Sequence, residues 1–143
     1  MGASIVGRWP GITYEQEQAL PGFWNDCGAW ADWLVACLGE PAAVAVLEAV
    51  DCAALLSCTS EGEDEEAIPW VSPEILVTQC KRMVQLITDK DPRVSLLIQL
   101  YGRSEDCEGP AESEMVQDLS DVQKIAESAQ EHGATRFTLD VNW

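Results

Sequence analysis

The stretch RFTLDVNW, residues 136–143, decides the fold class because its apolar and polar side chains alternate strictly. The apolar set is Phe137, Leu139, Val141 and Trp143, and the polar set is Arg136, Thr138, Asp140 and Asn142. Alternation with a period of two is typical of a strand with one buried face and one solvent face. The sequence therefore predicts a C-terminal strand whose apolar set faces the core.

Apolar side chains at helical spacing predict about five helices upstream of this strand. The helices cover residues 23–39, 41–50, 73–87, 92–101 and about 113–132. In the first helix Trp30 faces inward, Trp33 lies at the edge of the apolar stripe, and Trp24 falls off it. The predicted buried faces of the last three helices are Leu76, Cys80, Met83 and Ile87; Val94, Leu97, Ile98 and Tyr101; and Met115, Leu119, Val122, Ala126 and Ala129.

Two further segments complete the predicted sheet. The N-terminal run ASIVGRW, residues 3–9, predicts a strand, and the β-prone runs at residues 54–60 and 67–71 predict a hairpin around a polar loop. Pro69 would place the second run at an edge of the sheet. The expected fold is one α+β domain over residues 1–143, with about five helices packed on one face of a small mixed or antiparallel sheet and strands from both termini.

The charge balance limits the possible partners. The chain has 25 acidic against 8 basic side chains and a formal net charge of −17. Such a surface repels phosphate, so neither a nucleic acid nor a membrane partner is expected. The N-terminal residues lack the pattern of a signal peptide, and no stretch is apolar enough to span a bilayer, so we expect a cytoplasmic protein.

The sequence predicts no catalytic residues, no metal site and no cofactor. His132 is the only histidine, and its place at the end of the last helix favours a structural role. No nucleophile elbow, phosphate-binding loop or dinucleotide fingerprint occurs. The six cysteines form no C-x-x-C pair and are expected to be free, mostly buried thiols. A small enzyme that uses two carboxylates remains an alternative.

The acidic block EGEDEE, residues 61–66, is the main candidate for a function. From Trp9 to Cys80 the chain has Asp or Glu at 13 positions and no Lys or Arg. A solvated loop that prevents aggregation would explain the block, and so would a docking surface for a strongly basic protein. The predicted partner-binding residues are Glu61, Glu63, Asp64, Glu65, Glu66, Trp24 and Asp26, with the tryptophan as an interface anchor.

In size, acidity and lack of catalytic residues, the chain is similar to bacterial immunity proteins that neutralise toxins, many of them basic nucleases. The similarity is one of composition over the whole chain. It implies a non-catalytic acidic protein that binds and inhibits a basic toxin or enzyme. An adaptor with an apolar interface, whose acidic residues serve solubility alone, is a further alternative.

Overall fold

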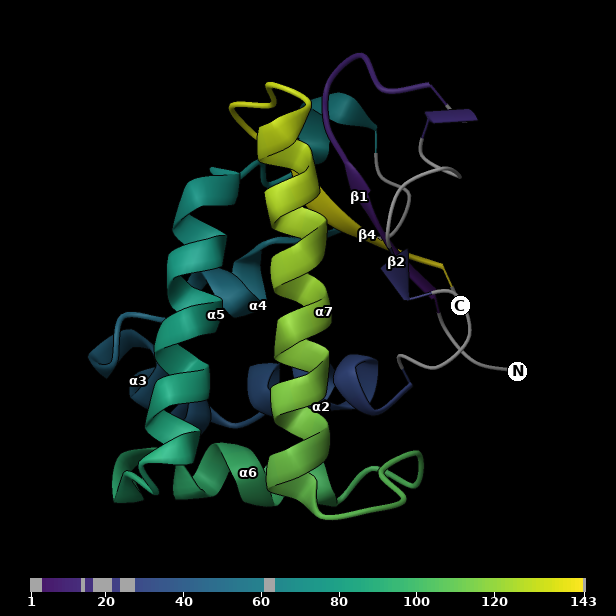
Figure 1. The fold of residues 1–143 in the computed structure, drawn as a ribbon. Coiled ribbons are helices and arrows are strands. Elements are labelled where there is room, and N and C mark those ends of the chain that lie inside the picture. The colour runs from purple at the N-terminus through teal and green to yellow at the C-terminus, as the bar shows by residue number, and fades with distance from the viewer. Residues whose placement is uncertain (1–3, 14, 17–21, 24–27, 61–63, 143) are drawn as a thin grey trace.

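The computed structural model describes residues 4–13, 15–16, 22–23, 28–60 and 64–142, and it confirms an α+β chain that is mostly helical (Figure 1). Strands of the described part are β1 (Ser4–Arg8), β2 (Gly22–Phe23), β3 (Thr59–Ser60) and β4 (Thr138–Asn142), in the order β2-β1-β4-β3. β1 and β4 are antiparallel neighbours, with Gly7 opposite Leu139, and β3 runs parallel to β4. The two predicted terminal strands therefore pair with each other at the centre of a mixed sheet.

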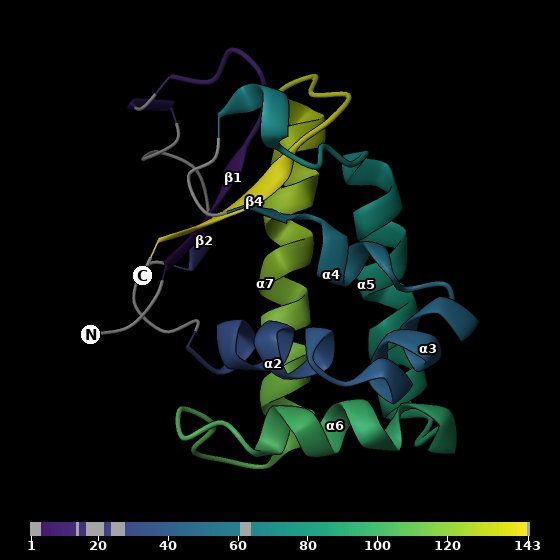
Figure 2. The same cartoon turned by 180° about the vertical axis from the view of Figure 1, so that it is seen from behind.

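The helices of the described part are α2 (Gly28–Leu38), α3 (Pro41–Ala49), α4 (Ala54–Ser57), α5 (Pro73–Thr88), α6 (Ser95–Gly102) and α7 (Ala111–Glu131), with short 3-10 helices η1 (Glu65–Ala67) and η2 (Pro92–Val94). α5 and α7 pack side by side, and α2 and α6 lie across their lower half (Figures 1 and 2). α7 also contacts β1, so it joins the helices to the sheet. Among the described residues no single helix is long and apolar enough to cross a membrane. α2 and α3 are long and apolar enough only when taken together, and the chain bends by 99° between them.

Local signals explain where the long helices begin and which faces they bury. α5 begins at Pro73, whose missing N–H costs nothing in a first turn, and Glu74 follows near the positive end of the helix dipole. The predicted inward positions of α5 and α7 are all buried: Leu76, Cys80, Met83, Ile87, Met115, Leu119, Val122, Ala126 and Ala129. The helical periodicity of these two segments is confirmed.

The helix α2 buries more of its surface than its stripe indicates. Trp30 and Trp33 are both fully buried, with ring centroids 4.9 Å apart. The indole N–H of Trp33 donates to the carbonyl of Leu97, at 3.0 Å. Because α6 covers this side of α2, placing Trp33 at the edge of the apolar stripe was wrong.

The predicted hairpin around the acidic block is also wrong. Residues 54–57 form α4 instead of a strand, since Ala and Leu favour a helical turn. The short strand β3 then pairs with β4, and Val71 forms an isolated antiparallel bridge to Phe137. The ends of both runs, Thr59–Ser60 and Val71, thus pair with the C-terminal segment and not with each other.

The strand β4 is buried on both faces. Phe137 and Leu139 face the core as expected, but Thr138 and Asp140 are also buried, at 0% and 9% exposure. The hydroxyl of Thr138 donates to the carbonyl of Cys58, at 2.9 Å. The solvent face that the alternation predicts is therefore not exposed at these two positions. The side chain of Val141 and all of Trp143 lie outside the described part of the chain.

Candidate functional site

Most of the predicted docking residues fall outside the described part of the chain. Glu61, Glu63, Trp24 and Asp26 are not described, and neither is the side chain of Glu65. Asp64 and Glu66 are exposed at η1, which replaces the expected hairpin tip. Neither carboxylate lines one of the two cavities described below.

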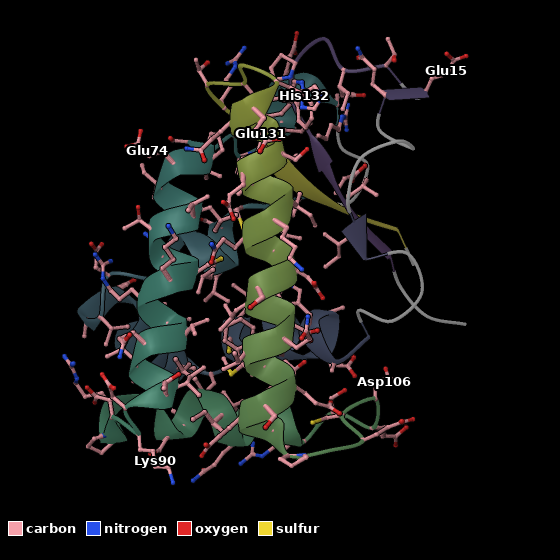
Figure 3. All side chains as sticks on the ribbon, viewed as in Figure 1. Glu15, Glu74, Lys90, Asp106, Glu131 and His132 are labelled. Carbon is pink, nitrogen blue, oxygen red and sulfur yellow. The ribbon has the colours of Figure 1, made fainter. Side chains whose placement is uncertain are left out.

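A second run of acidic residues does surround a cavity. Between Arg103 and Lys124 the chain has seven Asp or Glu side chains and no basic one. They occupy the loop after α6 and the first half of α7. A cavity of about 210 Å³ lies there, and its lining is Ala29, Tyr101, Asp106, Glu108, Glu114, Gln117 and Asp118. We call it the acidic recess. In Figure 3 the label of Asp106, at the lower right, shows at which end of the molecule the acidic recess lies.

Backbone and side-chain hydrogen bonds hold the loop of the acidic recess against α7 and α2. The Oε1 atom of Glu114 accepts from the amide of Gly109, at 2.8 Å. A Cβ at Gly109 would lie 3.1 Å from that same oxygen, so glycine permits the close approach. The hydroxyl of Ser104 donates to Asp32 at 2.6 Å and accepts from the amide of Asp106 at 3.2 Å. The recess therefore has a fixed wall on its loop side.

The electrostatics of the acidic recess favour positive charge. The hydroxyl of Tyr101, whose side chain is 1% exposed, donates a hydrogen bond to a carboxylate oxygen of Asp118. Burial, together with that bond, raises the pKa of Tyr101 far above its usual value. Burial, and then Glu114 and Asp118, raise the pKa of the Cys107 thiol to about 11. Asp106, Glu108 and Glu114 take part in none of the three ion pairs seen in the described part of the chain. The raised pKa values keep Tyr101 and Cys107 neutral, so neither adds negative charge to the recess at neutral pH.

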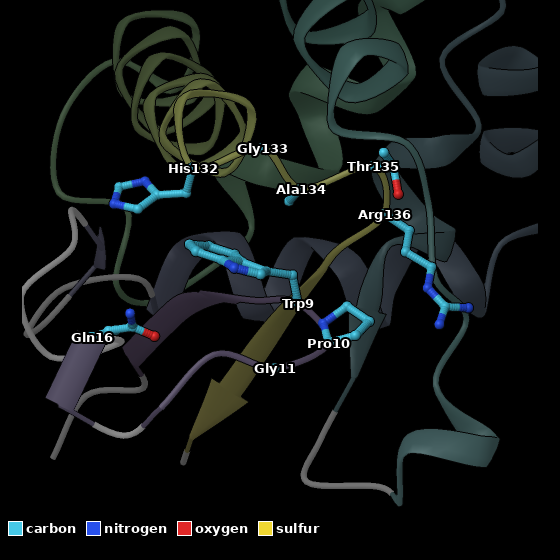
Figure 4. Close-up of a pocket in the computed structure, with 9 residues that line it drawn as sticks. All are labelled: Trp9, Pro10, Gly11, Gln16, His132, Gly133, Ala134, Thr135 and Arg136. Atoms are coloured by element: carbon cyan, nitrogen blue, oxygen red, sulfur yellow. The ribbon is translucent and has the colours of Figure 1, made fainter.

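A larger cavity, of about 470 Å³, lies at the other end of α7 (Figure 4). Its lining is Trp9, Pro10, Gly11, Gln16, His132, Gly133, Ala134, Thr135 and Arg136, and we call it the Trp9–His132 pocket. The rings of Trp9 and His132 pack with centroids 5.7 Å apart and planes tilted by 37°. The guanidinium of Arg136 lies 5.6 Å from the ring centroid of Trp70. Sequence reasoning missed this pocket, because its two walls are more than a hundred residues apart.

The histidine in this pocket is the helix-end residue that the sequence predicts. His132 follows the last residue of α7, and its Nδ1 atom lies 2.8 Å from the carbonyl oxygen of Ser128. A carbonyl oxygen only accepts hydrogen bonds, so Nδ1 carries the proton. The other ring nitrogen, Nε2, remains for the pocket.

The described cysteines are free thiols, and four of them are buried: Cys37, Cys52, Cys58 and Cys80. Burial raises the pKa of Cys37 to about 12, of Cys52 to about 11 and of Cys58 to about 12. Such thiols are poor nucleophiles and poor metal ligands at neutral pH. In the described residues no group of three or more His, Cys, Asp or Glu side chains is arranged to hold a metal ion. Cys27 lies outside the described part.

Comparison with known proteins assigns no family. The chain matches no protein-family model, no curated protein and no solved structure.

Proposed function

We propose that this is a non-catalytic binding protein that docks a basic protein partner through its acidic surface. The most concrete form is an immunity or inhibitor protein that neutralises a basic toxin or enzyme, such as a nuclease, in the cytoplasm. The observation that carries the proposal is the acidic recess, where four carboxylates from a loop and a helix line one concave site. Neither a nucleic acid nor a membrane is the proposed partner, since the net charge of −17 repels phosphate.

The size and charge of the acidic recess suit the side chain of a lysine or arginine. A cavity of about 210 Å³ admits one long side chain of a partner. Carboxylates and a guanidinium form short, charge-assisted hydrogen bonds, and these gain strength where water is excluded. The surrounding carboxylates also steer a basic partner toward the recess at long range.

The exposed carboxylates at η1 add to the negative electrostatic potential that steers a basic partner, although they lie outside the acidic recess. Asp64 and Glu66 follow the undescribed part of EGEDEE and remain exposed. In this proposal they speed the encounter, while the recess supplies the specific contact. Exposed charges act mainly on the association rate, and salt screens them.

A specific observation also supports the adaptor alternative. Val35 and Leu38 of α2 are 62% and 63% exposed, and Ala42 and Ala45 of α3 are exposed beside them in the chain. An apolar interface would use this surface and would bind as well in high salt as in low salt. The enzyme alternative would instead make the acidic recess an active site, so that losing one carboxylate would abolish turnover.

Binding to immobilised oligolysine and oligoarginine peptides tests the proposal without a known partner. Three double variants each remove two charges: Asp106→Asn with Glu108→Gln in the recess, Asp64→Asn with Glu66→Gln at η1, and Glu48→Gln with Glu74→Gln as the matched control. We expect the recess variant to associate about tenfold more slowly at low ionic strength, since its charges lie nearest the docked cation. The η1 variant should be affected less, and the control least.

The salt dependence completes this experiment. The association rates of the wild-type protein and the recess variant should converge in high salt, where the Debye length falls to about 3 Å at 1 M. If all three variants slow association equally, only net charge matters, and the recess is not a docking site.

A further inference from the structure

Two large apolar side chains of α2 are exposed next to each other. Among the described residues the exposed large apolar side chains are Val35 at 62%, Leu38 at 63% and Ile75 at 51%. Val35 and Leu38 lie three residues apart on α2, so their side chains are neighbours on the helix surface. A single exposed apolar residue is ordinary. The pair on α2 forms a continuous apolar surface that meets water.

This pair belongs to a row of side chains that begins in the acidic recess. Residues three apart along a helix form a continuous ridge, and this ridge consists of Ala29, Asp32, Val35 and Leu38. We call it the α2 ridge. Ala29 lines the acidic recess. At a rise of about 1.5 Å per residue, Val35 lies roughly 9 Å and Leu38 roughly 14 Å farther along the α2 axis than Ala29.

The loop of the acidic recess is bonded to the same ridge. The hydroxyl of Ser104 donates a hydrogen bond to Oδ2 of Asp32, at 2.6 Å, and accepts one from the amide of Asp106, at 3.2 Å. Asp106 lines the recess. In Figure 2 the loop after α6 lies below one end of α2, and α3 follows the other end. The same helix therefore positions the recess and the apolar pair at a fixed separation.

The charges along α2 and α3 define the chemistry of an occupant. Residues 28–50 contain three charged side chains, and all are acidic: Asp32, Glu40 and Glu48. A second copy of the chain would bring another net charge of −17 to this surface, so it would be repelled. An apolar pair among carboxylates instead complements an amphipathic helix whose apolar face is flanked by basic residues.

We propose that the α2 ridge seats an amphipathic helix of the basic partner. This helix places one lysine or arginine in the acidic recess and packs apolar side chains on Val35 and Leu38. The inference rests on the proposed function and adds to it the form of the partner's contact. The apolar residues follow the basic residue at i+7 and i+8, because these positions share its face of the helix and lie about 10–12 Å along it.

Two synthetic peptides of equal composition test this proposal by fluorescence anisotropy. Both are alanine- and glutamine-based, with lysines at both ends, one central arginine and a length of about 20 residues, which is enough to form a helix. The first peptide has leucines at i+7 and i+8 from the arginine, on the same face. The second has them at i+5 and i+9, on the opposite face. We expect the first peptide to bind the wild-type protein about tenfold more tightly, because only its leucines reach the apolar pair while the arginine occupies the recess.

Substitutions on the protein then assign the contact. The ridge variant, Val35→Thr with Leu38→Gln, should bind the first peptide about tenfold more weakly than the wild-type protein does. This loss should persist at 1 M salt, where charges are screened beyond about 3 Å. The recess variant, Asp106→Asn with Glu108→Gln, should weaken binding at low salt only. Ile75→Thr removes an exposed apolar side chain from α5 and, as the matched control, should leave the affinity unchanged.

The possible failures of this inference and of the proposed function are distinguishable. Equal binding of the two peptides by the wild-type protein, or equal effects of the ridge variant and Ile75→Thr, would overturn the α2 ridge. The slower association of the recess variant with oligoarginine would still support the proposed function. If the recess variant bound both oligoarginine and the first peptide as the wild-type protein does, the proposed function would fail as well. A wild-type dimer in analytical ultracentrifugation that the ridge variant makes monomeric would assign the ridge to a second copy and contradict the proposal.

Discussion

Substituting Gly7 by alanine tests how closely β1 packs against α7. A Cβ at Gly7 would lie 2.8 Å from the Cγ2 atom of Ile125, a distance that real Cβ atoms essentially never show. Ile125 is 2% exposed, and its Cγ2 is fixed on the branched carbon next to the helix backbone, so it cannot swing away. Either the strand or the helix must move.

The expected cost follows from two opposing terms. Inserting a methyl group into a packed core destabilises by about 1–3 kcal/mol. Replacing glycine by alanine restricts the unfolded chain and returns about 0.4–1 kcal/mol. We expect Gly7→Ala to lower the free energy of unfolding by about 1–2 kcal/mol, which corresponds to a fall in Tm of roughly 3–6 °C for a chain of this size.

Urea unfolding followed by circular dichroism measures this change, with Gly39→Ala as the matched control. A Cβ at Gly39 would lie 3.6 Å from the carbonyl oxygen of Val35, an ordinary contact. The control should therefore stay within about 0.5 kcal/mol of the wild-type protein. The urea midpoint of Gly7→Ala should fall while the slope of the transition remains unchanged.

A double-mutant cycle identifies the clash. Ile125→Leu removes the Cγ2 branch at nearly constant volume and should by itself cost less than about 1.5 kcal/mol. Combined with Gly7→Ala, it should relieve the contact, so the double variant is more stable than the sum of the single effects predicts, by about 0.5 kcal/mol or more. A Gly7→Ala protein as stable as the wild type, or strictly additive effects, would refute the packing of β1 on α7.

Three further results are expected. In the native protein Ellman's reagent should modify Cys107 slowly, since the pKa of its thiol is raised to about 11. The four buried thiols should react only after unfolding, which peptide mapping would reveal. Rapid modification of Cys37 would contradict its burial. Hydrogen bonds from Arg93 hold the pKa of Asp91 at about 2, below its ordinary 3.8, so the stability that this contact adds over Asp91→Asn should be constant above pH 3.8 and disappear as the pH falls toward 2. If the difference in urea midpoint between the wild-type protein and Asp91→Asn stayed constant from pH 3.8 to pH 2, the contact would be excluded. Removing residues 137–143 should abolish cooperative thermal unfolding, because Phe137 and Leu139 are fully buried and each is worth roughly 1.5–3 kcal/mol; a truncated chain with the Tm of the whole protein would show that β4 is dispensable.

Helical periodicity made the long helices predictable from the sequence. A helix closes its hydrogen bonds within its own segment, so caps and spacing alone place Pro73 at the start of α5 and Leu76, Cys80 and Met83 on its buried face. The alternation in residues 136–143 likewise indicated a strand, because a period of two is a local property.

Strand partners could not be predicted in this way, since pairing is decided between segments far apart in the chain. The runs around EGEDEE look like two strands of a hairpin, yet β3 and Val71 pair with the C-terminal segment. Thr138 and Asp140, which the alternation had assigned to solvent, are also buried in the folded chain. A sequence pattern gives the polarity of a face, but what packs on that face in the folded chain decides whether it meets water.

The sequence by itself determined the charge of this protein, its long helices and its terminal strands, because these depend on residue type and on contacts between near neighbours; it did not reveal the short helix α4. Only the tertiary structure decided where the charge gathers into a concave site. The acidic recess unites Ala29 and Tyr101 with carboxylates after residue 105, and the Trp9–His132 pocket unites the two ends of the chain. Both cavities arise where distant segments pack, and the distances between such segments are set by the whole core rather than by any stretch of sequence.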